Sequence, residues 1–150
     1  MMKVHVVIGS VFGIGYFPIA SATAATLVQA SWIYVFFNKA TIVEVPLFVV
    51  LFFIAVKSAG EAEKILGHDA SEIVIDEICG FMVTLFLLDR SSLQVILVAF
   101  FLFRFFDVLK PWPIRRSQRL HGGLGIVIDD VLAGVYSNIV LRLLLALGII

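Results

Sequence analysis

The sequence is poor in cysteine and in charge, and its charges cancel. A single cysteine, Cys79, excludes an intrachain disulfide and a cysteine-based zinc cage. Charged residues make up 15% of the chain, below the roughly 25% of soluble domains, which argues against a water-soluble globular protein. The 11 basic and 11 acidic residues leave no net positive field, so we expect no nucleic-acid partner.

Apolar residues are abundant instead. They make up 61% of the 150 residues, and the mean hydropathy is +1.10. Soluble domains contain about 45–50% apolar residues, and disordered chains contain fewer. The length is that of one domain, so we expect residues 1–150 to form a single membrane-embedded domain.

Five apolar runs of 14 to 20 residues predict an all-α fold. They cover residues 20–37, 43–56, 73–88, 93–106 and 131–150. A helix needs about 20 residues to cross ~30 Å of hydrocarbon, so several of these helices are short. We therefore expect an integral membrane bundle of about four to five short transmembrane helices, with residues 4–17 as an N-terminal re-entrant or interfacial segment.

The basic residues are distributed unevenly among the connections. The N-terminus and two long connections, 57–72 and 107–130, hold most of the Lys and Arg near segment ends, whereas the two short links hold only Lys39 and Arg90. The positive-inside rule then predicts a multi-pass protein of the inner (cytoplasmic) membrane, with the long connections in the cytoplasm. The chain has no internal repeat, which disfavours a repeat-built transporter.

Acidic residues interrupt or end three of the apolar segments. These residues are Asp76, Glu77, Asp107, Asp129 and Asp130. An ionised carboxylate is costly to bury unless a cation or hydrogen bonds compensate it. Mg²⁺ prefers carboxylate oxygens and fills its remaining positions with water or phosphate, so the pattern predicts a magnesium site at a membrane boundary.

Ion pairing is the competing interpretation, and it fits one of these acids well. Arg104 and Lys110 stand three residues to either side of Asp107 and can share its helix face. This interpretation does not account for the two adjacent acidic pairs. Arg104 lies within an apolar segment, so it needs a partner, which is either Asp107 or a phosphate.

Glycines lie next to both acidic pairs. Gly80 and Gly134 each follow an acidic pair by three or four residues, so two helices could approach closely there. Gly122, Gly123 and Gly125 precede the second pair in a turn whose backbone amides would suit a phosphate.

The connection 107–130 also concentrates cations. For Arg115, Arg116 and Arg119 we favour attraction to lipid headgroups over a phosphate clamp. His121 is a candidate either for proton transfer or for a loop contact.

Three ordered blocks of the second half resemble the phosphatidylglycerophosphatase A family. They are Ile75–Gly80, Phe103–Ile114 and His121–Gly134. The resemblance implies an all-α, membrane-embedded, Mg²⁺-dependent enzyme that removes the terminal phosphate of phosphatidylglycerophosphate to give phosphatidylglycerol. It also implies that the five acids above are metal ligands, that Asp76 and Asp130 are catalytic, and that His121 handles phosphate. In the mechanism we expect, His121 is catalytic as a proton donor to the leaving group. Arg104, Lys110, Thr23, Gly122 and Gly123 would then bind substrate.

The N-terminal block departs from this family's pattern. The family shows Gly-x-Gly leading to Pro-Gly-Thr-x-Gly-Ser, whereas here residues 13–15 lead to Ser21–Thr26, with the sequence SATAAT. Thr23 keeps its position and Thr26 replaces the serine. We therefore expect this segment to handle phosphate differently.

Other functions stay open at this point. The same acids could form the relay of a small ion transporter, although a relay calls for acids at mid-membrane rather than near segment ends. A structural membrane subunit, or a phosphatase of another lipid phosphate, would fit as well. The expected partner is a phospholipid substrate in the membrane, and a homo-oligomer is left open.

Overall fold

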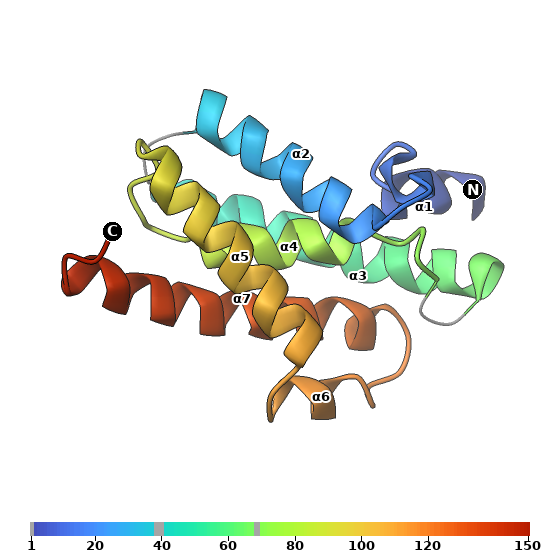
Figure 1. Ribbon diagram of the computed structural model, residues 1–150. Helices are drawn as coiled ribbons and strands as arrows, with labels where there is room; N and C mark the ends of the chain where they lie inside the picture. The colour runs from blue at the N-terminus through green and yellow to red at the C-terminus, as the bar shows by residue number, and fades with distance from the viewer. Residues whose placement is uncertain (1, 38–40, 68–69) are drawn as a thin grey trace.

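The computed structural model describes residues 2–37, 41–67 and 70–150, and this part of the chain is helical without strands (Figure 1). Its helices are α1 (Met2–Gly9), α2 (Ser21–Phe36), α3 (Glu44–Leu66), α4 (Ile75–Thr84), α5 (Leu93–Leu109), α6 (Ile114–Ser117) and α7 (Gly123–Ala146), with a 3-10 turn at Ile14–Tyr16. The predicted all-α class is confirmed. The short link predicted at 38–42, with Lys39, lies largely outside the described residues.

Three helix boundaries differ from the predicted ones. α3 continues to Leu66, through charged residues that the sequence pattern places in a connection, because the small residues Ala59 and Ala62 keep one of its faces fully buried. α7 begins at Gly123, so the glycines at 123 and 125 belong to the helix rather than to a turn before it. α4 ends early, at Thr84.

Membrane-spanning length is met by two of the described helices. α3 has 23 residues, α7 has 24, and both are apolar enough to cross a membrane. α2 and α5 have 16 and 17 residues, and α4 has 10, all short of the roughly 20 that a perpendicular span needs. The count of four to five spans therefore stays a prediction.

The helices α4 and α7 touch through their backbones. A Cβ atom on Gly80 would lie 2.6 Å from the carbonyl oxygen of Asp130, and one on Gly134 would collide with the carbonyl oxygen of Gly80. This confirms the close approach predicted from the two glycines. As a result, the acidic pair in the first turn of α4 lies directly beside the pair on α7.

One end of the bundle collects the functional segments. Figure 1 shows α4 and α7 beginning, and α5 ending, toward the same end, with α6 below them in the connection from α5 to α7. α3 also reaches this end, where the backbone of Gly123 lies against the carbonyl group of Val56. The connections after α3 and after α5 therefore lie at the same end of the bundle as the acidic residues of α4 and α7.

Candidate active site

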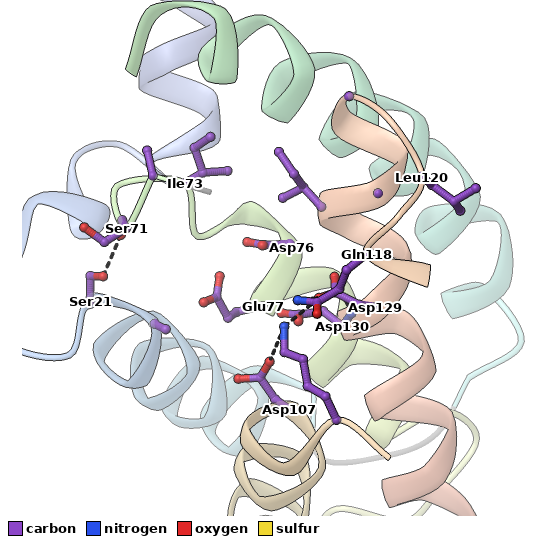
Figure 2. Close-up of a pocket in the computed structure, with 16 residues that line it drawn as sticks. Ser21, Ser71, Ile73, Asp76, Glu77, Asp107, Gln118, Leu120, Asp129 and Asp130 are labelled. Carbon is purple, nitrogen blue, oxygen red and sulfur yellow. Dashed lines mark hydrogen bonds and ion pairs between the residues drawn. The ribbon is translucent and has the colours of Figure 1, made fainter. Parts of the chain in front are cut away.

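A cavity of about 350 Å³ opens at this end of the bundle (Figure 2). It is bounded by the start of α2, by residues 70–73, by the first turn of α4 and by the chain from the end of α5 into α7. Its lining includes all five predicted carboxylates, which are Asp76, Glu77, Asp107, Asp129 and Asp130. Residues from three sequence blocks therefore form one site.

Three of these acids form a tight cluster, and none of the described residues gives them a cationic partner. One oxygen each of Asp76, Glu77 and Asp130 lies within 4.8 Å of the others. Glu77 and Asp130 are 8% and 3% exposed. Asp76 Oδ1, Glu77 Oε2 and Asp130 Oδ2 are buried and have no hydrogen-bond partner. Such a cluster repels itself when it is ionised, and a hard divalent cation is the group that its oxygens fit.

The other two acids are paired with cations of the chain. Asp129 Oδ2 accepts hydrogen bonds from Lys110 Nζ at 2.6 Å and from Gln118 Nε2 at 3.2 Å. Asp107 Oδ2 lies 2.8 Å from Arg104 Nη1, and Asp107 Oδ1 lies 3.7 Å from Lys110 Nζ. The ion-pair interpretation of Asp107 is therefore confirmed. The Arg104 contact is electrostatic, because this nitrogen makes no aligned hydrogen bond.

Lys110 is the cation held inside the cavity. Burial alone would lower the pKa of Lys110, but its hydrogen bond and charge interaction with Asp129, together with the charges of Asp130 and Asp107, raise this pKa above its usual range. Lys110 thus remains protonated beside the acidic cluster, where it can neutralise a bound anion.

Several residues predicted for the site do not line the cavity. Arg104 faces an apolar groove on α5, and Thr23 lies half-buried on α2. Gly123 packs against the Val56 carbonyl group, so its role here is close helix packing. His121 is exposed, although Gly122 beside it is part of the lining.

The sequence patterns missed other lining residues. Ser21 and Ala22 line the cavity, and Ser21 Oγ donates a hydrogen bond to the Ser71 carbonyl group at 2.6 Å. Both residues stand where the family motif has Pro and Gly, so the departure from that motif was the available signal. Gln118 lies in a polar loop, and nothing in the sequence around it indicated its contact with Asp129.

Comparisons with known proteins agree with the earlier resemblance. The sequence profile of the family described as Phosphatidylglycerophosphatase A matches residues 7–145. A protein of Bacteroides thetaiotaomicron with the provisional name phosphatidylinositol-3-phosphatase is 40% identical over 144 residues, which are 91% of this chain and 90% of that protein.

Two relatives carry the family's own name. Phosphatidylglycerophosphatase A of Haemophilus influenzae is 53% identical over 74 residues, which are 49% of this chain and 45% of that protein. The Escherichia coli protein of the same name is 48% identical over 71 residues, which are 47% and 41% of the two chains. No solved structure matches the chain.

The catalytic class follows from this match. The chain belongs to the phosphatidylglycerophosphatase A family. It is accordingly a phosphoric monoester hydrolase of the phosphatidylglycerophosphatase type.

Proposed function

We propose that this protein is a Mg²⁺-dependent lipid phosphate monoesterase that converts phosphatidylglycerophosphate to phosphatidylglycerol at the cytoplasmic face of the membrane. The observation that carries the proposal is the cluster of three buried, unpartnered carboxylate oxygens in the cavity that Lys110 also lines, with Lys110 Nζ hydrogen-bonded to Asp129. Two relatives named phosphatidylglycerophosphatase A support phosphatidylglycerophosphate as the substrate.

The donor set fits a hard cation. Asp76, Glu77 and Asp130 would hold one or two Mg²⁺ ions through oxygens that have no other partner. When bound, Mg²⁺ polarises phosphoryl oxygens and lowers the pKa of a coordinated water. The only cysteine, Cys79, is fully buried in the core, which argues against a thiol nucleophile.

The remaining residues would orient and neutralise the phosphate. Lys110 would bind the phosphoryl oxygens and offset the charge that develops during transfer. Asp129 and Asp107 hold the ammonium group of Lys110 between them, at 2.6 Å and 3.7 Å. Arg104 contacts Asp107 rather than the cavity, so it would act through that carboxylate.

Phosphate release from the purified protein tests this proposal. In neutral detergent with phosphatidylglycerophosphate, we expect release of inorganic phosphate with Mg²⁺ and none after chelation with EDTA. Asp130→Asn serves as the matched inactive control. Release that is insensitive to EDTA would contradict the metal dependence. The absence of release with every divalent cation tested would contradict phosphatidylglycerophosphate as the substrate.

A phosphoinositide is the second candidate substrate. The Bacteroides relative, which aligns with 91% of this chain, is named for phosphatidylinositol 3-phosphate. Ser21 and Ala22, which depart from the family motif, line the cavity where a headgroup would enter. The same assay with phosphatidylinositol 3-phosphate decides between the two: a higher kcat/KM than for phosphatidylglycerophosphate would replace the first substrate by the second.

We further propose that the protein is multi-pass and that its cavity faces the cytoplasm. Large apolar side chains are exposed on the outer faces of the helices, such as Phe53 on α3 and Phe101 on α5. Asp76 and Glu77 lie in the first turn of α4 and Asp107 lies near the end of α5, rather than at the middle of these helices, which disfavours the transporter alternative.

Cysteine labelling tests this orientation. In a Cys79→Ala background, a membrane-impermeant thiol reagent should label His121→Cys from the cytoplasmic side and Ser91→Cys from the opposite side; both positions are exposed. The reverse pattern would contradict the orientation.

A further inference from the structure

A basic groove adjoins the acidic cavity. It has a volume of about 790 Å³ and lies along the chain from the end of α5 through α6. Its charged lining residues are all cations, namely Lys110, Arg115, Arg116 and Arg119. Lys110 and Gln118 line both the groove and the cavity, so the two spaces are neighbours.

An apolar groove adjoins the basic one on its other side. This second groove, of about 860 Å³, follows the outer face of α5 and is lined by apolar residues apart from Arg104. Leu109 lines both grooves. The surface therefore runs in a fixed order from an apolar groove, through a basic groove, to an acidic cavity.

This order matches one class of phospholipid. A lipid such as phosphatidylglycerophosphate carries acyl chains, then a phosphodiester, then a terminal phosphomonoester. The cavity of about 350 Å³ is at the small end of ligand pockets, so it can take a phosphorylated headgroup but not a whole lipid. The rest of the substrate must lie outside it.

We propose that Arg115, Arg116 and Arg119 form a second anion site, which binds the phosphodiester of the substrate while the monoester occupies the acidic cavity. The proposal rests on the proposed function and names its substrate class, which is phospholipids with both a diester and a terminal monoester. Arg suits this role because its planar fork donates two hydrogen bonds to a phosphate. Phosphatidic acid has no diester, so it lacks this contact.

General attraction to an anionic membrane is the competing explanation for these arginines. That attraction depends on surface charge and not on the position of a phosphate. At a low mole fraction in neutral micelles neither lipid gives the surface an appreciable charge, so this attraction would favour neither phosphatidic acid nor phosphatidylglycerophosphate. Comparison of these two lipids in neutral detergent therefore separates the explanations.

The kinetic test uses the variant Arg115→Gln/Arg116→Gln/Arg119→Gln and a control with the same charge change, Lys3→Gln/Lys57→Gln/Lys64→Gln, at exposed positions outside the groove. Each lipid is presented at low mole fraction in neutral micelles. We expect the parent to prefer phosphatidylglycerophosphate by at least about tenfold in kcat/KM, and the arginine variant to lose about 10- to 100-fold on that lipid only. The lysine control should keep the parental preference.

Three kinetic results would overturn the proposal. The first is a parent with equal kcat/KM on both lipids. The second is an arginine variant that loses the same factor on both lipids, and the third is a lysine control with the same loss as the arginine variant, because either result points to surface attraction.

A binding measurement tests the groove without turnover. Trp112 lines the groove and is 75% exposed, so in a Trp32→Phe background it reports lipid contact by fluorescence. Phosphatidylglycerol with brominated acyl chains keeps the diester and should quench Trp112 at a lower mole fraction than brominated diacylglycerol, which has no phosphate, in the parent and in the lysine control alike. The arginine variant should lose this difference, and equal quenching in parent and variant would overturn the proposal. Failure of phosphate release alone would contradict only the proposed function.

Discussion

The two ends of the bundle bury carboxylates in opposite ways. At the end away from the cavity, Glu44 at the start of α3 is 9% exposed and forms a buried ion pair with Arg90. Glu44 also accepts hydrogen bonds from the backbone amides of Thr41 at 3.0 Å and Leu87 at 3.4 Å. In the cavity, Asp76, Glu77 and Asp130 each have one buried oxygen that accepts no hydrogen bond from the described part of the chain.

The difference separates a stabilising cluster from a functional one. Around Glu44 the polar groups form hydrogen bonds and ion pairs between different segments. One of them is Arg142 on α7, whose Nη2 donates a hydrogen bond to the Phe86 carbonyl group at 2.7 Å. Asn138, also on α7, donates to the Thr84 carbonyl group at 2.9 Å. In the cavity, no described side chain compensates the three unpartnered oxygens, and in the function we propose a bound cation would do so. Buried carboxylates therefore stabilise the fold where a cation of the chain pairs with them, and we expect them to bind a ligand where no such cation is present.

Neutralising the unpartnered acids should separate activity from stability most strongly. For Asp76→Asn and Asp130→Asn we expect phosphate release to fall by at least about 100-fold, because each substitution removes a carboxylate that would bind Mg²⁺. The thermal midpoint should stay equal or rise, since repulsion within the cluster decreases. Both are measured on protein in detergent, and near-parental turnover in both variants would remove these residues from the site.

The opposite result is expected at the other end. Arg90→Met leaves the buried Glu44 carboxylate without its cation and should lower the free energy of unfolding by about 3–5 kcal/mol. Activity per folded molecule should stay near the parental value. The double variant Glu44→Leu/Arg90→Met should recover much of the stability, as measured by chemical denaturation. A single variant as stable as the parent would show that the pair has no stabilising role.

Arg104 and Asp107 lie between these two extremes, because they are paired and yet adjoin the cavity. Replacing both charges in Arg104→Met/Asp107→Leu should leave stability nearly unchanged, since apolar groups often replace a buried pair without loss. Activity should fall by about tenfold, because Lys110 loses one of the two carboxylates that hold it. Phosphate release at the parental rate would remove the pair from the mechanism.

The smallest effect is expected at His121, which is exposed and outside the cavity lining. His121→Gln should change kcat/KM by no more than about twofold, as is typical of surface substitutions. A loss of about 100-fold, with an altered pH profile, would instead support proton transfer, one of the two roles that the sequence leaves open for this histidine.

The sequence predicted the components of the site better than their arrangement. Acids that interrupt apolar runs were visible as anomalies, and Gly80 and Gly134 indicated the close approach of two helices. The spacing of Arg104 and Lys110 around Asp107 indicated local ion pairs, which the structure contains. Contacts between neighbours on one helix depend on local periodicity, so they can be predicted from sequence.

Partners far apart along the chain could not be predicted in the same way. The pairing of Lys110 with Asp129 and the contact from Gln118 depend on how the connection after α5 folds back over α7. The buried Glu44–Arg90 pair joins residues from segments that looked like ordinary polar ends. In neither case did periodicity or composition distinguish these side chains from solvated charges.

By itself, the sequence determined an apolar, all-helical chain with five acids at segment boundaries, because composition and periodicity fix which residues avoid water. Only the tertiary structure decided which three of those acids stay unpartnered and which two are neutralised. It also decided that the basic and apolar grooves adjoin the cavity. The physical reason is that the net charge of a cluster depends on which side chains converge in space, and helix packing sets that convergence.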